Sequence, residues 1–221
     1  MKIHGISYAR STLPENMVLA GGDPEKKCDI VFLLYVIDTG HRRVLIDAGC
    51  DTLPDFEMED FVSSAKALEN YGIAPAQITD VIITHAHHDH IDGLRHFAHA
   101  DVYIQQEEYT RGKKYIPEAA RVHTFDKETV VAECVRVLRV GGHSVGSSIA
   151  LVTAGDTRYV FGGDECYLPV CLETGIPTGA SRDPEASCWF VSHFADPDYR
   201  VLLSHDPKIK TGILYSERNS T

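Results

Sequence analysis

The chain has 221 residues, 43% of them hydrophobic, which is enough for one substantial core, so we expect a single domain spanning residues 1–221. Its formal net charge of −11 opposes the basic surface that nucleic acids and anionic membranes require, and neither is expected as a partner. The N-terminus lacks the hydrophobic core of a signal peptide, and no apolar run is long enough to span a bilayer. The six cysteines include no Cys-x-x-Cys pair, so we expect free thiols and a cytoplasmic protein.

The first part of the chain predicts a strand, a loop, two strands and a helix. After the initial strand, residues 11–27 contain two prolines and a Gly-Gly pair without apolar periodicity, which indicates a long loop that could cover a site. Residues 30–37 and 43–46 are apolar and rich in β-branched side chains, which predicts two strands joined by a turn. Residues 56–71 carry apolar side chains at helical spacing and are followed by Gly72, which predicts an amphipathic helix.

The remainder of the chain is predicted to form mainly strands. These lie near residues 80–84, 101–105, 130–140, 147–153 and 157–161. Asp183 and Pro184 then begin a helix that runs to about Phe194. Strands, a helix, further strands and a second helix suit two sheets packed face to face, with helices outside them.

Residues 85–90 read His-Ala-His-His-Asp-His and are the strongest functional signal in the chain. They follow the predicted strand 80–84, so the ligand-type side chains stand at a strand end. Alternate residues of an extended segment face one side, so we expect His85, His87 and Asp89 to point together. His90 would then turn toward a neighbouring site, and one loop could supply ligands to two metal ions.

Three further ligand-type residues, His143, Asp164 and His205, each follow an apolar strand-like run. Imidazole and carboxylate groups suit zinc, and three protein ligands with an open position mark a catalytic site. Manganese, iron and cobalt accept the same donors, so the sequence predicts divalent ions, most simply zinc. We interpret the remaining histidines, including His88, as ordinary core or surface residues.

The spacing of these residues resembles that of the metallo-β-lactamase superfamily. The seven matching positions are His85, His87, Asp89, His90, His143, Asp164 and His205. Within the superfamily, the chain is most similar to the N-acyl-homoserine lactonases, which are dinuclear zinc enzymes that open the lactone ring of bacterial signal molecules. Tyr167 stands three residues after Asp164, as in those lactonases, and the resemblance covers roughly residues 30–206.

This resemblance implies an α+β fold, the αββα four-layer metallo-β-lactamase sandwich. It implies one metal held by His85, His87 and His143, a second held by Asp89, His90 and His205, and Asp164 bridging the two. A shared hydroxide would attack the lactone carbonyl, because metal binding lowers the pKa of water from 15.7 toward about 7. Tyr167 would stabilise the oxyanion, and Asp89 would protonate the leaving alkoxide. The partner would be a small-molecule lactone or ester, and such relatives are often homodimers.

Other activities stay open, because one scaffold and metal pair serve several hydrolyses. Thioester hydrolysis of the glyoxalase II type uses the same ligands, although Tyr167 has no obvious place in it. A β-lactamase usually enters the periplasm, and RNA-processing relatives need a basic surface, so the sequence disfavours both. A di-iron redox protein generally has glutamate at the position of His87. A non-catalytic binding protein on this fold would tend to have lost ligands.

Two segments and two cysteines are further candidates near the site. By resemblance, an acyl chain would enter a cleft lined by residues 11–27 and 112–120. Cys166 and Cys171 flank Tyr167 in the sequence. We interpret both as small buried residues, and redox control or stray metal binding is the alternative.

Overall fold

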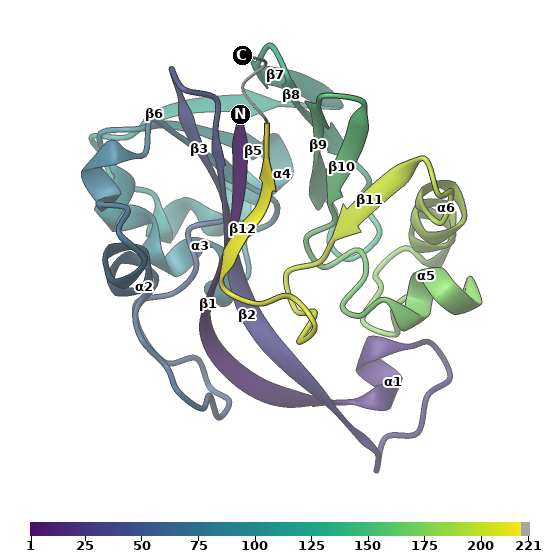
Figure 1. Ribbon diagram of the computed structural model, residues 1–221. Helices are drawn as coiled ribbons and strands as arrows, with labels where there is room; N and C mark the ends of the chain where they lie inside the picture. Colours follow the sequence, from purple (N-terminus) through teal and green to yellow (C-terminus); the bar gives the residue numbers. More distant parts are fainter. Residues whose placement is uncertain (218–221) are drawn as a thin grey trace.

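The computed structural model describes residues 1–217 and consists of two β-sheets packed face to face, with helices on their outer faces (Figure 1). The larger sheet has seven strands in the order β12-β1-β2-β3-β4-β5-β6. The smaller has five, in the order β11-β10-β9-β8-β7. This arrangement confirms the predicted αββα sandwich. Among residues 1–217, no helix has the length and apolar character needed to cross a bilayer.

The strands of the larger sheet are β1 (Lys2–Pro14), β2 (Lys27–Asp38), β3 (Arg43–Ile46), β4 (Asp80–Ile83), β5 (Asp101–Gln105), β6 (Arg121–Phe125) and β12 (Gly212–Ser216). Those of the smaller sheet are β7 (Glu128–Ala132), β8 (Val135–Arg139), β9 (Ser148–Ala154), β10 (Thr157–Phe161) and β11 (Tyr199–Leu202). The α-helices are α1 (Glu15–Val18), α2 (Ser64–Tyr71), α3 (His88–Ile91), α4 (Gln106–Gly112), α5 (Val170–Thr174) and α6 (Pro184–Phe194). Short 3-10 helices are η1 (Pro75–Gln77), η2 (Asp92–Phe97) and η3 (Lys113–Tyr115).

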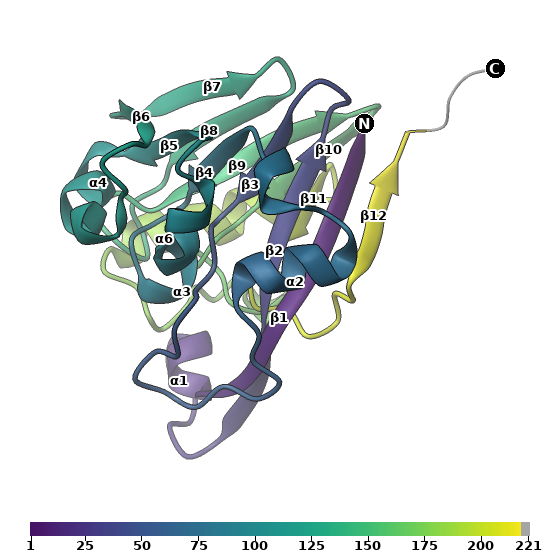
Figure 2. The same cartoon turned by 90° about the vertical axis from the view of Figure 1, so that its left-hand side faces the viewer.

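Strand β2 lies between two hydrophobic cores because it is apolar on both faces. Phe32 and Leu34 pack in the outer core beneath α2, which Figure 2 shows lying across β1 and β2. Leu33 and Tyr35 point the other way and form the core between the two sheets. The period-two alternation of a strand sends successive side chains to opposite faces, so one apolar segment joins both layers. On the far side, Phe190 of α6 covers the smaller sheet.

Parallel strands bring chain segments distant in sequence to one edge of the sandwich. Strands β3 and β4 are parallel neighbours in the larger sheet, and β10 and β11 are parallel neighbours in the smaller. The carboxyl ends of parallel neighbours lie at the same edge, where ligand-binding loops commonly gather. The segments that follow β4, β10 and β11 carry His85, Asp164 and His205, so these residues converge.

The predicted strands at residues 30–37, 43–46, 101–105 and 157–161 and the helix at residues 184–194 are confirmed. The predicted loop at residues 11–27 is wrong in its first part. Strand β1 continues to Pro14, paired in register with β2 down to Lys27, and α1 follows directly. This end of the β1–β2 hairpin extends beyond the sandwich and has exposed polar side chains. It therefore lacks the alternation of apolar and polar residues that predicts a strand.

Two other predicted boundaries are also wrong. The helix expected over residues 56–71 begins only at Ser64, because Glu59 instead pairs with Arg10 through backbone hydrogen bonds of 2.8 and 2.9 Å. Gly72 ends this helix in the left-handed conformation, as expected, with φ +97°. The strand expected over residues 130–140 is the hairpin of β7 and β8, whose turn at residues 133–134 interrupts a valine-rich segment.

Candidate dimetal centre

The seven predicted ligands converge in two groups at the edge where the strands end. Ligand atoms within each group lie within 4.8 Å of one another. The first group contains His85, His87, His143 and Asp164, and the second contains Asp89, His90 and His205. The expectation that Asp89 points with His85 and His87 is therefore wrong. Residues 88–91 form the helical turn α3, so the alternation of an extended segment stops at His87.

The three histidines of the first group bring their ring nitrogens close together. Nδ1 of His87 lies 2.9 Å from Nε2 of His85 and 3.0 Å from Nε2 of His143. Three nitrogens bound to one tetrahedral zinc at 2.0–2.1 Å would stand about 3.3 Å apart, so the spacing fits a single ion. Burial lowers the pKa of His85, and partial desolvation beside the His143 imidazole lowers that of His87, so both rings are neutral at pH 7. A neutral imidazole offers the lone pair that a metal needs.

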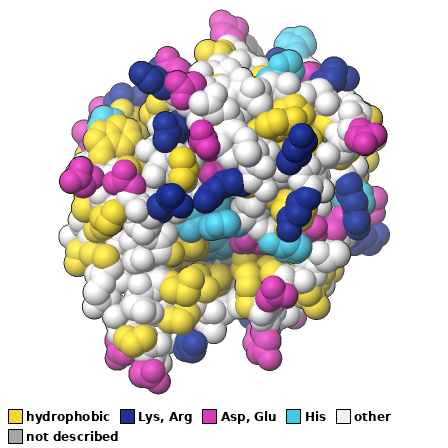
Figure 3. Space-filling view, turned by 180° about the vertical axis from the view of Figure 1, so that it is seen from behind, with side chains coloured by type: hydrophobic (Ala, Val, Ile, Leu, Met, Phe, Trp, Pro, Cys, Tyr) yellow, Lys and Arg dark blue, Asp and Glu magenta, His cyan; other side chains and the backbone are white. Residues whose placement is uncertain are grey.

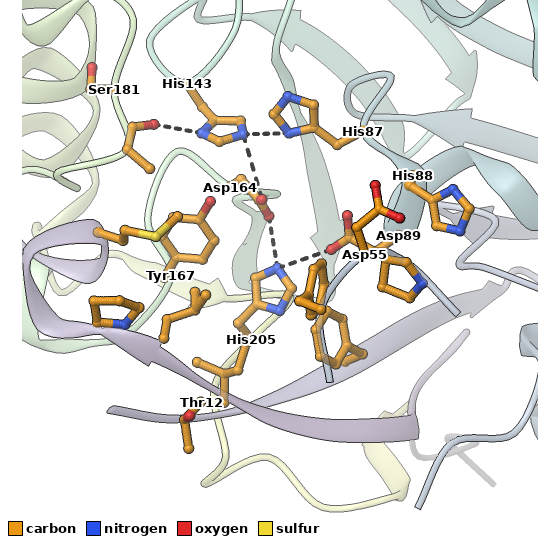
Figure 4. A pocket seen from close by; sticks show the side chains of 18 of the residues that line it. Thr12, Asp55, His87, His88, Asp89, His143, Asp164, Tyr167, Ser181 and His205 are labelled. Atoms are coloured by element: carbon orange, nitrogen blue, oxygen red, sulfur yellow. Dashed lines mark hydrogen bonds and ion pairs between the residues drawn. The ribbon is translucent and has the colours of Figure 1, made fainter. Parts of the chain in front are cut away.

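Asp164 lies between the groups and presents one oxygen to each (Figure 4). Its Oδ1 is 3.1 Å from Nε2 of both His90 and His205. Its Oδ2 is 3.7 Å from Nε2 of His85 and 3.6 Å from Nε2 of His143. A carboxylate in this position is placed to bridge two cations.

Backbone carbonyls orient two of the imidazoles. Nδ1 of His143 lies 2.7 Å from the carbonyl oxygen of Ala180, and Nδ1 of His205 lies 2.9 Å from that of Val31. A carbonyl only accepts, so Nδ1 donates a proton in each ring and Nε2 is the nitrogen turned toward the other ligand-type groups. This is the orientation in which histidine binds a metal through Nε2.

His90 is oriented by a carboxylate, Asp47, which sequence reasoning missed. Nδ1 of His90 lies 2.7 Å from Oδ2 of Asp47, whose Oδ1 accepts a 2.7 Å hydrogen bond from the backbone N–H of Thr84. Nε2 of His90 is buried and has no hydrogen-bond partner among residues 1–217. It is 3.1 Å from Asp164 Oδ1 but not aligned for hydrogen bonding. An orphaned imidazole nitrogen facing carboxylates and imidazoles fits coordination of a cation.

Two buried glutamates that sequence reasoning also missed hold the ligand loops together. Glu108 accepts hydrogen bonds from the backbone N–H of Ala86 at 2.9 Å and from Gly146 at 2.9 Å, so it links the loops that carry His87 and His143. Glu165 accepts hydrogen bonds from the backbone N–H groups of His143 and Gly142. Burial raises the pKa of Glu165 to about 7. Neither glutamate lies in a motif, and only the folded loops give them a role.

Tyr167 lies beside the centre, where the sequence predicted it. Its ring centroid is 5.2 Å from that of His205 and 5.9 Å from that of His143. Burial raises its pKa well above 10, and the nearby carboxylates of Asp164 and Asp89 add to this effect. The hydroxyl therefore keeps its proton at neutral pH and can donate a hydrogen bond.

The centre opens into a cleft of about 970 Å³. One wall is apolar and comes from two segments, with Leu13 and Met17 on the N-terminal hairpin and its helix, and Leu53 and Phe56 on the loop after β3. Residues 11–27 thus line the cleft, as expected, and Tyr115 is the contribution of the segment 112–120. The loop of residues 51–60, which was not predicted to contribute, is fixed against β1 by its backbone pairing.

His88 and the cysteines lie outside both ligand groups of the described residues. His88 joins neither ligand group; its Nε2 lies 2.9 Å from the carbonyl oxygen of Thr52, although its side chain borders the cleft. All six cysteines are free. Cys166 and Cys171 are fully buried, and their thiols donate to the carbonyl oxygens of Leu168 and Val18.

Comparisons with known proteins agree with this geometry. A profile of the metallo-β-lactamase superfamily matches residues 33–205. The N-acyl homoserine lactonase of Bacillus thuringiensis is 23% identical over 210 residues, which cover 83% of each protein. Metallo-beta-lactamase domain-containing protein 1 of Xenopus laevis is 33% identical over 97 residues, and this match spans 42% of the chain and only 39% of that relative.

A solved structure has the same fold over nearly the whole chain. It is an N-acyl homoserine lactone hydrolase with the product N-hexanoyl-L-homoserine bound at its catalytic metal center. It superposes with a TM-score of 0.79 at 19% identity and covers 93% of both chains. At that identity the likeness shows the fold, whereas the sequence profile covers most of the chain. The protein therefore belongs to the metallo-β-lactamase superfamily.

Proposed function

We propose that the protein is a dinuclear-zinc hydrolase that opens lactone rings, with N-acyl-homoserine lactones as candidate substrates. The observation that carries the proposal is the position of Asp164, with one oxygen toward each histidine group and Tyr167 beside it, at the base of the cleft. The likeness to lactonases in sequence and fold supports this choice within the superfamily.

The proposed ligands follow the two groups. His85, His87 and His143 would hold one ion, Asp89, His90 and His205 would hold the other, and Asp164, with one oxygen toward each group, would serve both. Two divalent ions in these positions would supply a hydroxide at neutral pH and would polarise the substrate carbonyl. The protein's part is to fix the ligands, and the buried acceptors behind His90, His143 and His205 support that role.

Tyr167 and Asp89 are the proposed catalytic residues. The protonated Tyr167 hydroxyl donates to the carbonyl oxygen as negative charge develops on it, a contribution that typically accelerates such reactions about 10²–10³-fold. The alkoxide released by ring opening needs a proton. Asp89 borders the cleft, so it is placed to carry that proton from solvent.

The apolar wall supports a substrate with a hydrocarbon chain. Phe32 lies at the bottom of this wall, with its ring centroid 5.0 Å from that of His205 and 5.9 Å from that of Phe56. Met17, Leu53 and Phe56 are more than a third exposed, which is unusual for large apolar side chains gathered in one place. An acyl chain lying on them would remove this apolar surface from water.

The test is acid release, followed with a pH indicator, when zinc-loaded protein meets a panel of acyl-homoserine lactones, simple γ- and δ-lactones, a thioester and a β-lactam. The proposal predicts lactone turnover that disappears on chelation and returns with zinc. Turnover of the thioester or β-lactam without that of any lactone would keep the metal chemistry and overturn the substrate class. A protein that binds no metal and cleaves nothing would instead be a binding module.

A further inference from the structure

Arg182 borders the cleft without a carboxylate partner. Among residues 1–217, no acidic oxygen lies within ion-pair distance of its guanidinium, and its side chain is exposed at the cleft. Its backbone N–H is fixed by a 2.8 Å hydrogen bond to Gly142. The adjacent Asp183 is engaged elsewhere, because it accepts hydrogen bonds from the backbone N–H groups of Glu185 and Ala186 at the start of α6.

An unpaired arginine in this position is notable because acidic residues are abundant. The chain has 32 aspartate and glutamate residues against 21 lysine and arginine residues. Most arginines elsewhere are paired with a carboxylate, as Arg42 is with Asp80 and Arg158 with Asp198. Within residues 1–217, Arg111, Arg139 and Arg200 also lack such a partner, but none of them borders the cleft. An exposed arginine without a partner is most often simply solvated. Its place in a concave cleft that also holds the ligand groups favours a role in binding.

The position of Arg182 relative to the apolar wall predicts how a substrate would be oriented in the cleft. Figure 4 shows Ser181, its neighbour, beyond His143, and Thr12 beyond His205, with Asp164 between. The carbonyl oxygen of Ala180 is bonded to His143, whereas Phe32 packs on His205. Arg182 therefore lies on the His143 side of the candidate centre, and Phe32 with Phe56 lies on the His205 side. Met17 of the apolar wall lies nearer Arg182, because its carbonyl oxygen accepts a 3.0 Å hydrogen bond from the backbone N–H of Ala180.

Basic and apolar side chains also lie on different sides of the cleft at the protein surface. Figure 3 shows histidines in a hollow, with lysine and arginine side chains along one side of it and hydrophobic side chains along the other. Lys114 lies 4.6 Å from the ring centroid of Tyr115, which borders the cleft. Asp55, the acid that borders the cleft away from the ligand groups, belongs to the apolar loop. Basic side chains thus gather along one side of the cleft on a protein of net charge −11.

We propose that Arg182 binds a carboxylate of the substrate, so that the enzyme prefers lactones with an anionic group on the side of the ring oxygen. This inference rests on the proposed lactone hydrolysis and names its substrate class. The carbonyl would lie at the centre, with the hydrocarbon chain on the apolar wall and the carboxylate on the arginine. A planar guanidinium matches one carboxylate through two parallel hydrogen bonds.

The test compares two lactones that differ in one group. Both are γ-butyrolactones with a hexyl chain on the α carbon; one has a carboxylate on the γ carbon and the other a carboxamide of nearly the same shape. The quantity measured is the ratio of their kcat/KM values, for the wild type, R182Q, R182K and the control R200Q. Arg200 is an arginine of the smaller sheet that packs over Tyr159, away from the cleft.

The wild type is expected to favour the carboxylate, and R182Q to lower that ratio about 10- to 100-fold, the range for loss of a charge-assisted hydrogen bond. R182K keeps the charge without the planar fork, so its ratio is expected to be intermediate. R200Q is expected to keep the wild-type ratio. Added salt is expected to lower the wild-type ratio and leave that of R182Q nearly constant. Equal ratios in the wild type and R182Q would overturn the inference.

A binding measurement separates this inference from the proposed reaction. The ring-opened product of each lactone is titrated into zinc-loaded protein and followed by calorimetry. The product with the second carboxylate is expected to bind about 10- to 100-fold more tightly, and R182Q is expected to remove the difference. If neither lactone is cleaved, the proposed function fails, and this titration still decides the role of Arg182. Equal affinities of the two products would contradict that role.

Discussion

Replacing Asp47 by asparagine is expected to weaken binding of the metal that His90 would hold. Oδ1 of Asp47 accepts from the backbone N–H of Thr84, and Oδ2 accepts from the Thr84 hydroxyl at 2.9 Å and faces Nδ1 of His90. In asparagine one of these oxygens becomes an N–H₂ group. Whichever way the amide is turned, it confronts a buried donor, either the Thr84 N–H or the His90 Nδ1–H.

The size of the effect follows from these contacts. Leaving one buried donor unsatisfied costs about 1–3 kcal/mol of unfolding free energy. Loss of the carboxylate behind a metal-binding histidine typically weakens metal affinity about 10- to 100-fold. Asp47 has φ +59°, a left-handed conformation that asparagine tolerates as well as aspartate. D47N therefore tests the carboxylate without adding backbone strain, which D47A would do.

The assay is competition for zinc between metal-free protein and a chromophoric chelator, which gives the number of ions bound and both affinities. The matched control is D38N, because Asp38 also accepts a backbone N–H, that of Gly40, and a side-chain donor, Arg43, at the end of β2. D38N is expected to bind zinc as the wild type does. The reasoning is refuted if D47N binds two zinc ions with wild-type affinity.

Three further predictions test the centre and the cleft. Y167F is expected to lower lactone turnover about 10²–10³-fold with zinc content unchanged, measured by steady-state kinetics and metal analysis; unchanged turnover would remove Tyr167 from the mechanism. F56A is expected to raise KM for long-chain lactones more than for short-chain ones, because Phe56 forms part of the apolar wall, and an equal change for all chain lengths would contradict this. Chelation is expected to lower the melting temperature, because zinc bound only by the folded state stabilises it; an unchanged melting temperature would count against a bound ion.

The convergence of the candidate ligands could be predicted from the sequence, because the segments that carry them follow apolar strands. His85, Asp164 and His205 come after strands that run parallel to a neighbour, and carboxyl ends of parallel strands meet at one edge. The helix α6 was equally predictable, since Asp183 caps it through a side-chain acceptor and Pro184 occupies its first turn. Both features were predictable because short stretches of sequence determine them.

The groups behind the ligands could not be predicted in this way. Asp47 acts on His90, which is 43 residues further along the chain, and no local motif connects them. Glu108 likewise reaches Gly146, 38 residues away, through a contact that exists only when the loops are packed. The split between Asp89 and His87 depends on one helical turn, α3, whose four residues are too few to produce a helical period. Such features require the tertiary structure.

The central claim is that two metal ions held by this chain open a lactone. The most direct measurement is ring opening of a lactone, followed by acid release, while metal-free protein is titrated with zinc. The account predicts that turnover rises until two equivalents are bound, and that H90A, which removes the imidazole oriented by Asp47, saturates with fewer ions and little turnover. Two equivalents of tightly bound zinc without cleavage of any lactone, or full turnover with no metal present, would contradict it.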